Sequence, residues 1–74
     1  IRYELRSPAQ ATLNVYDVTG NLVRTLARGT RAAGFYAVEW DGKDNSAARV
    51  RTGVYVYKLT AGKASQSGKM IFLR

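Results

Sequence analysis

The feature that most limits the fold of this chain is an alternation of apolar and polar residues with a period of two. In the first run, Ile1, Tyr3 and Leu5 alternate with charged residues. A period of two is typical of a β-strand with one buried face, because successive strand side chains point to opposite sides. An amphipathic helix would instead repeat its apolar residues at spacings of three and four. The sequence therefore predicts a chain built from strands.

The alternation recurs along the chain and predicts six or seven short strands. Turn-forming residues separate the runs, among them Pro8, Gly20 and the Asp- and Asn-rich stretch 41–46. No amphipathic helix interrupts the strands, so the pattern favours an all-β fold, a small antiparallel sandwich. The strands are expected at 1–6, 12–16, 22–26, 35–40, 54–59 and 64–73, with a loop at 29–34.

The length of 74 residues allows one domain, 1–74, with a thin core. A domain of this size hides only about 60% of the surface of its unfolded chain. The chain has no Cys and no His, which excludes disulfides, thiolate nucleophiles, imidazole metal ligands and His-dependent triads. No apolar run approaches the roughly 20 residues of a membrane helix, so no transmembrane segment is expected. We predict no catalytic residue, no cofactor and no enzyme activity.

Several segments, taken in their order and spacing, resemble one family of domains. They are Tyr-Asp-Val-Thr-Gly-Asn at 16–21, Leu-Val-Arg-Thr-Leu at 22–26, Ala-Gly-Phe at 33–35, Trp-Asp-Gly-Lys-Asp-Asn at 40–45, the run at 52–59 and the end of the chain at 69–74. Together they resemble the FlgD-type Ig-like domain and the related C-terminal Ig-like and type 9 secretion sorting domains of secreted bacterial proteins.

The resemblance covers nearly the whole chain and implies an Ig-like β-sandwich with a non-catalytic role in contacts with other proteins. One departure is visible. Members of the family usually have a Gly soon after the Asp-Asn turn, where this chain has Ala47 and Ala48. The departure concerns the geometry of that turn and any ion site there, but not the fold.

Four side chains with oxygen atoms are the candidates for a metal site. Asp17, Asp41, Asp44 and Asn45 offer the hard ligands that calcium prefers. Their spacing is not that of an EF-hand loop, and the chain is already strongly positive. Asx turns, in which the side chain accepts a hydrogen bond from the backbone two residues on, explain the same residues better. We therefore expect no metal.

The aromatic residues allow two interpretations. Trp40, with Tyr36, Tyr55 and Tyr57, offers stacking surfaces for a sugar or a base. Trp40 is in phase with the apolar residues of its strand, however, which favours a place in the core. At least one of Tyr55 and Tyr57 is expected to bury its ring and bond through its hydroxyl. Tyr3 is expected to be partly exposed.

The net charge is +7, from twelve Lys and Arg against five Asp and Glu. These basic residues are spread over strands and loops, and the densest group is Arg49 and Arg51 near Lys43. This distribution argues against a specific nucleic-acid site, although a weak attraction to polyanions is expected. Charged strand edges also discourage aggregation.

The remaining interpretation is an interaction surface made by the edges of the sheets. Ile1, Tyr3 and Leu5 are the predicted anchors for strand addition, and the predicted receiving edge lies near Met70, Ile71, Phe72 and Leu73. The alternative is an ordinary first strand that closes its own sheet.

We therefore predict a structural, protein-interaction module of an exported bacterial protein, extracellular or on the cell surface, whose partners are copies of itself or a passenger domain. In this interpretation strand pairing assembles it into a fibre. One alternative is a C-terminal sorting or appendage domain of a secreted enzyme or adhesin, and a second is a carbohydrate-binding module.

Overall fold

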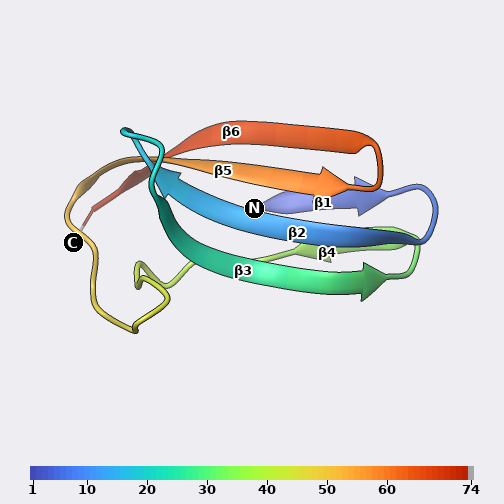
Figure 1. Ribbon diagram of the computed structural model, residues 1–74, viewed down its shortest axis with the longest axis horizontal. Helices are drawn as coiled ribbons and strands as arrows, with labels where there is room; N and C mark the ends of the chain where they lie inside the picture. Colours follow the sequence, from blue (N-terminus) through green and yellow to red (C-terminus); the bar gives the residue numbers. More distant parts are fainter. Residues whose placement is uncertain (74) are drawn as a thin grey trace.

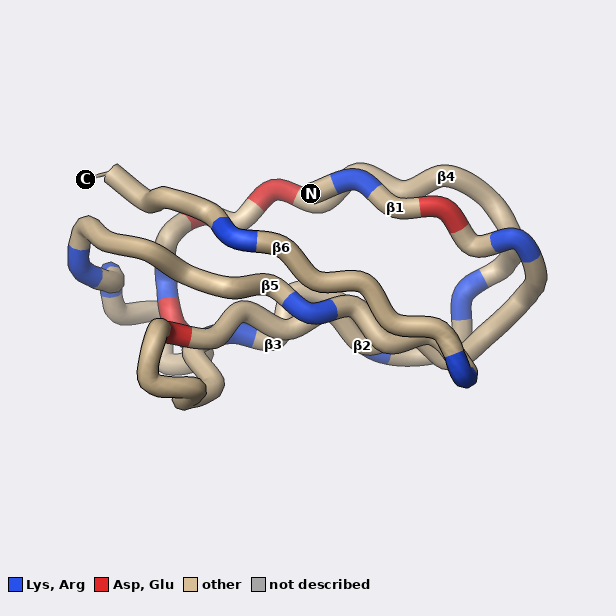
Figure 2. The backbone as a smooth tube through the Cα atoms, turned by 90° about the horizontal axis from the view of Figure 1, so that it is seen from above, with Lys and Arg blue, Asp and Glu red and all other residues tan. Residues whose placement is uncertain are grey.

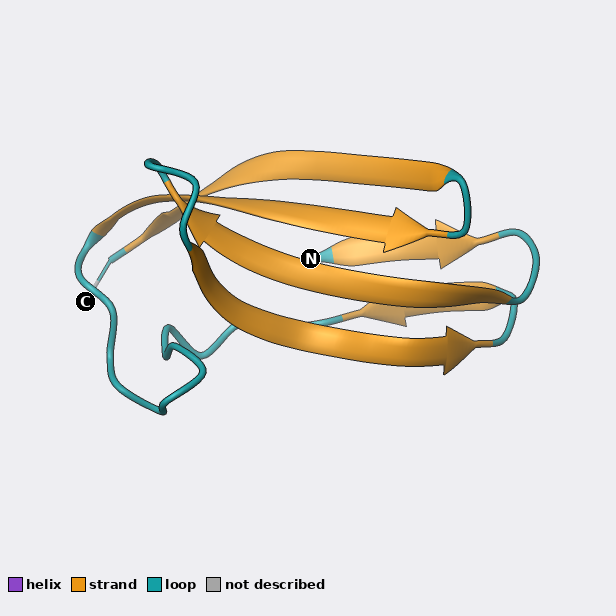
Figure 3. Ribbon diagram, viewed as in Figure 1, coloured by secondary structure: helices purple, strands orange, loops and turns teal. Residues whose placement is uncertain are grey.

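The computed structural model describes residues 1–73, which form six strands and no helix. Four strands make one antiparallel sheet in the order β3-β2-β5-β6, and β1 and β4 make a second, two-stranded sheet behind it (Figure 1, Figure 3). The prediction of an all-β, antiparallel sandwich is confirmed. The strands are β1 (Arg2–Leu5), β2 (Ala9–Asp17), β3 (Leu22–Arg31), β4 (Gly34–Ala37), β5 (Gly53–Ala61) and β6 (Ala64–Phe72).

Three strands have bounds that differ clearly from those that the sequence predicts. The second strand begins at Ala9 instead of residue 12, because Ala9 and Gln10 already pair with β3. The third strand continues through the predicted loop to Arg31, because β3 stays paired with β2 as far as Ala9 and Gly29 lies opposite Ala11. Two register shifts in this pair accommodate the extra residues of β3. The fourth strand is shorter than predicted, ending at Ala37. Beyond it the chain turns away into a long loop, residues 39–52.

The core lies between the two sheets, where alternate residues of the strands point inward. Leu13 at the centre of β2 is fully buried, and Tyr3 is 6% exposed, so the prediction of a partly exposed Tyr3 is wrong. Its ring stacks on that of Tyr36 across the β1-β4 pair, with the centroids 5.1 Å apart. Burying one large apolar side chain contributes about 1.5–3 kcal/mol. The buried cluster consists of Tyr3, Leu5, Ala11, Leu13 and Leu59.

Aromatic side chains close the end of the sandwich at the 39–52 loop. The half-buried Trp40 ring packs against Tyr55, with the centroids 5.0 Å apart, and against Phe72, at 5.3 Å. Its indole N–H donates to the carbonyl of Lys43 at 3.0 Å. The hydroxyl of the buried Tyr55 donates to the carbonyl of Arg51 at 2.7 Å. The prediction of a buried tyrosine with a bonded hydroxyl is confirmed, whereas Trp40, predicted to lie in the core, is half-buried and packs at the end of the sandwich, outside the buried cluster.

Gly42 allows this loop to reach the aromatic rings. Gly42 is buried, with φ at +76°, and a Cβ there would overlap the ring of Phe72. An L-residue at this position would therefore meet two penalties, a left-handed backbone and a steric overlap.

Ala47 stands in the turn where the family usually has Gly nearby. Its φ is +65°, and no other non-glycine residue within 1–73 has a positive φ. The turn is held by Asp44, whose Oδ1 accepts hydrogen bonds from the N–H groups of Ser46 and Ala48 at 2.8 and 3.0 Å. An alanine in the left-handed region costs roughly 1–2 kcal/mol, which the bonds of this turn offset.

The substitution Gly42→Ala should destabilise the domain by about 2–4 kcal/mol, since overpacking adds to the cost of the left-handed backbone. Gly20→Ala is the matched control, because Gly20 has φ at +88° but nothing within 4 Å of its Cβ position. It should cost only about 1–2 kcal/mol. Urea unfolding measures both. Equal losses would show that the Phe72 ring moves freely aside.

Replacing Ala47 by Gly should stabilise the domain by about 0.5–1 kcal/mol, because relief of the left-handed alanine outweighs the greater entropy of an unfolded Gly. Ala48→Gly, one residue later and without a positive φ, should lower the stability by about 0.4–1 kcal/mol. Thermal and urea unfolding of both variants provide the comparison. A loss of stability in both would contradict the strain at Ala47.

Candidate interaction edges

The outer edge of β3 is covered near its start, at Val23 and Thr25, by the 39–52 loop. Asn45 imitates a strand residue: its N–H donates to the carbonyl of Val23, and its side-chain Oδ1 accepts from the N–H of Thr25, both at 3.0 Å. The Arg24 guanidinium holds the same loop, donating to the carbonyls of Lys43 and Asp44 at 3.2 and 3.3 Å. These bonds satisfy part of the edge that would otherwise be open.

The opposite edge of the four-stranded sheet, β6, has β5 as its one neighbour among the described residues. The N–H of Gly62 donates to Gln10 on the β2 side at 3.2 Å, so Ala61 turns its backbone groups toward Ala64 of β6. Since bonded pairs alternate along an antiparallel ladder, every second residue of β6 points its N–H and C=O to the open edge. These residues are Ser65, Ser67, Lys69 and Ile71.

The edge of β1 is open on the same side of the molecule. Ile1 and Val38 exchange both backbone hydrogen bonds at 2.8 Å, and the alternation then turns Tyr3 and Leu5 toward β4. The N–H and C=O groups of Arg2 and Glu4 consequently point away from β4. Figure 1 shows that β6 extends beyond β1 on this side.

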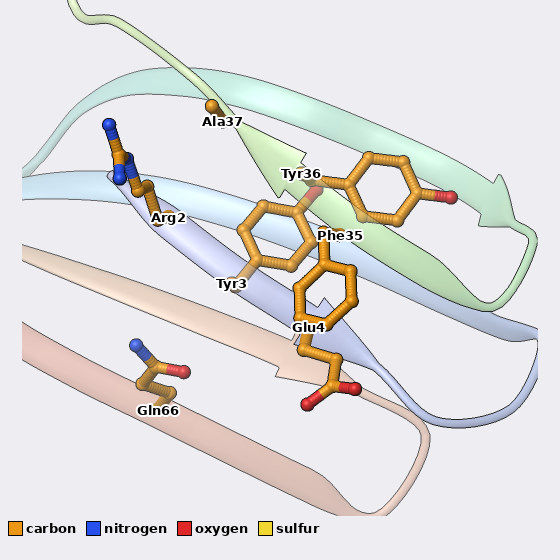
Figure 4. A pocket seen from close by; sticks show the side chains of 7 residues that line it. All are labelled: Arg2, Tyr3, Glu4, Phe35, Tyr36, Ala37 and Gln66. Carbon is orange, nitrogen blue, oxygen red and sulfur yellow. The ribbon is translucent and has the colours of Figure 1, made fainter.

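A groove of about 540 Å³ runs beside this edge of β1 (Figure 4). Gln66 of β6 stands on the far side of it, and Phe35 of β4, which pairs with Glu4, is 84% exposed. A hollow of about 300 Å³ continues the groove past Leu5 to Ala64. The residues that line the main groove are Arg2, Tyr3, Glu4, Phe35, Tyr36, Ala37 and Gln66.

The first predicted interaction residues lie in the sheet of their own chain. Tyr3 and Leu5 are buried and pair with β4, and Ile1 is half-buried. This pairing is the alternative that the sequence left open, and the role of these residues in strand addition stays a prediction.

The residues of the predicted receiving edge divide between two faces of β6. Met70 and Phe72 are half-buried on the inner side, whereas Ile71 and Leu73 are 73% and 74% exposed. The structure brings Ile1, Met70, Ile71 and Phe72 together around a hollow of about 310 Å³.

The candidate metal ligands act in turns. Asp17 Oδ1 accepts from the N–H of Thr19 and of Asn21, both at 3.0 Å, and Asp41 Oδ1 accepts from the N–H of Lys43 at 3.0 Å. With the bonds of Asp44, all three carboxylates cap turns, as the Asx-turn interpretation predicts. Within residues 1–73, no three Asp or Glu side chains gather as metal ligands would.

The basic residues lie on both layers and in the loops, as seen from above in Figure 2. A single ion pair is found among the described residues, between Arg24 and Asp41 at 3.5 Å. Across residues 1–73, no helix has the length and hydropathy needed to span a bilayer.

Sequence reasoning missed the residues that make the groove and those that cover β3. The alternation of Arg2 and Glu4 with apolar residues shows which face they occupy, but not that their edge stays open. Phe35 and Gln66 come from strands far apart in the sequence, and the sequence predicts Asn45 as a turn residue or metal ligand but not as a cover for β3. Their roles follow from strand order, which no local pattern encodes.

Comparison with known proteins finds similarity to one family, both in a family model and in two curated relatives. The model of the FlgD Ig-like domain family matches residues 1–65. The basal-body rod modification proteins FlgD of Salmonella typhimurium and Salmonella typhi are each 39% identical to this chain over 59 residues. The match covers 78% of this chain and 25% of each relative, so the chain spans about a quarter of the length of these curated relatives.

These relatives correct the predicted location. The sequence predicts an extracellular or cell-surface protein, and this prediction is wrong, because both relatives are named for modification of the basal-body rod. The prediction drew on the secreted domains within the resemblance, whereas the matched proteins belong to its flagellar part.

The Asp17 turn should make stability depend on pH. The hydrogen bond from the Thr19 side chain, followed by those from Asn21 and the Thr19 backbone, lowers the pKa of Asp17 below its ordinary value of 3.8. Because the pKa is lower in the folded state, the ionised carboxylate stabilises the fold at pH values above the pKa of the unfolded chain. This stabilisation is lost as the pH falls through the pKa of the folded chain. The melting temperature of Asp17→Asn should therefore be lower than that of the parent at about pH 6, and this difference in melting temperature should narrow toward about pH 2. A difference that stays constant over this range would rule out a contribution of Asp17 ionisation to stability.

Proposed function

The chain belongs to the FlgD Ig-like domain family, and from that premise we propose that it is a non-catalytic structural module that associates with copies of itself by strand pairing at the open edge of β6. Family membership indicates a structural, protein-interaction role. The strand-pairing mechanism and the identity of the partner are the proposal.

The contrast between the two edges of the four-stranded sheet carries the proposal. Asn45 and Arg24 cover part of β3, whereas β6 is nine residues long and has no cover among the described residues. Natural proteins usually protect such an edge with charges, a proline, a bulge or a loop. Here the protection is a single lysine, Lys69. An edge left open over this length is suited to pairing with a second strand.

The side chains of β6 are compatible with a second copy of the same strand. In an antiparallel pair centred on Gly68, Ser67 would lie opposite Lys69 of the second copy, and Ser65 opposite its Ile71. No like charges would then face each other directly. Ile71, which is 73% exposed, would gain contacts across the new pair. The two four-stranded sheets would become one continuous sheet.

The geometry gives no comparable support to the sugar-binding alternative. Trp40 is half-buried, its N–H is engaged by Lys43, and its ring packs against Tyr55 and Phe72. A stacking site for a sugar would need an open aromatic face. The interaction alternative is therefore favoured.

The substitution Ser67→Pro should abolish self-association while the domain stays folded. The N–H of Ser67 points to the open edge, so a proline there removes a bond that only a partner strand could use. Sedimentation velocity over a range of concentrations should show the parent associating and Ser67→Pro remaining monomeric. Its free energy of unfolding should fall by no more than about 1 kcal/mol.

Gln66→Pro is the matched control, one residue away. The N–H of Gln66 points toward Leu59 of β5, so this proline removes a bond of the domain itself and should cost at least about 1–3 kcal/mol. A parent chain that stays monomeric at high concentration, or a Ser67→Pro variant that associates as the parent does, would disprove pairing through β6.

A further inference from the structure

The two sheets are unequal, and the position beside β1 in the smaller sheet is open. Four strands face two, and the groove of about 540 Å³ occupies the place next to β1. We propose that this groove binds one extended, acidic segment of a partner protein, which pairs with β1 as a third strand of its sheet. This site is distinct from the β6 edge and does not depend on self-association.

The backbone of β1 offers the hydrogen bonds for such a strand. Arg2 and Glu4 turn their N–H and C=O groups away from β4, because Ile1 bonds to Val38 and the pattern alternates from there. An added strand would satisfy these groups in an ordinary ladder. Main-chain bonds of this kind supply affinity, and the alternate side chains supply specificity.

The walls of the groove are suited to apolar side chains on the inner face of the added strand. Tyr3 and Leu5 lie on the β1 side, and Ala64, Gln66 and Gly68 lie on the inner face of β6. The ring of Tyr57 lies so close to Gly68 that a Cβ there would overlap it. Tyr57 therefore fills the space over Gly68, and the short side chains of Ala61 and Ala64 leave room for residues such as Val at alternate positions of the added strand.

The outer face determines the charge of the segment. Along β1 and the residue after it, the exposed side chains are Arg2, Glu4 and Arg6, in the order basic, acidic, basic (Figure 2). Opposite charges across a strand pair attract, and like charges repel. The best partner thus presents carboxylates opposite the two arginines and a lysine opposite Glu4. The net charge of +7 also favours an acidic segment.

A folded second copy does not fit this site. Its open β6 edge carries Lys69 and no carboxylate. In addition, β6 extends past β1 (Figure 1), so a whole sandwich that approached β1 would meet β6 first. A single extended segment avoids both conflicts.

The probe for this site is a capped nine-residue peptide, Thr-Val-Glu-Val-Lys-Val-Glu-Val-Thr. It reads the same in both directions, so its charges match β1 in a parallel or an antiparallel pair. The control peptide exchanges the charges, Thr-Val-Lys-Val-Glu-Val-Lys-Val-Thr. In a titration followed by amide chemical shifts, the first peptide should bind at least about tenfold more tightly than the control. The shifts should centre on Arg2, Glu4 and Gln66.

Two variants of the protein separate this proposal from its rivals. Glu4→Pro removes an N–H at the open edge and should abolish peptide binding, whereas Ser67→Pro should leave binding unchanged. The double variant Arg2→Glu with Arg6→Glu keeps the backbone and should reverse the preference between the two peptides, so it decides the matter if Glu4→Pro does not fold.

Equal binding of both peptides by the parent, or shifts centred on Ser67 and Lys69 instead of β1, would overturn the proposal. Failure of self-association through β6 would leave these peptide measurements unaffected.

Discussion

The backbone of a strand needs hydrogen-bond partners on both sides, and this domain has too few strands to provide them everywhere. Four strands face two, so edges are left that no neighbouring strand can satisfy. On β3 a loop residue, Asn45, supplies two of the missing bonds, at Val23 and Thr25. On β6 and β1 the backbone groups point into solvent or into a groove. The domain therefore offers main-chain amides and carbonyls as its means of recognition.

The covered and open edges are linked through one loop. Residues 39–52 cover β3 through Asn45 and Arg24, and the same loop packs Trp40 and Gly42 against Phe72 near the end of β6. A disturbance at Gly42 thus reaches both sides of the four-stranded sheet. The tight fit of the Phe72 ring also fixes the end of β6, where the neighbouring Ile71 is exposed.

The sequence predicts the strands well because alternation is a local property. It fails where pairing decides the outcome. Gly29 looks like a break, yet β3 continues through it because β2 supplies a partner opposite. Tyr3 is predicted to be partly exposed but is buried, since its ring stacks on Tyr36, a residue far away in the sequence. Which edge stays open depends on the order of strands in the sheets, and that order is absent from any single run of residues.

The family match bears differently on the two open edges. It covers residues 1–65 and so includes β1 and its partner β4, whereas most of β6, at Ala64–Phe72, lies beyond it. The strand β1, with Arg2 and Glu4, therefore lies in the region that the FlgD Ig-like domain model matches. The long uncovered edge of β6 rests on the structure of this chain alone. Binding of a partner strand at β1 and self-association at β6 therefore rest on different observations, although both edges open on the same side of the sandwich.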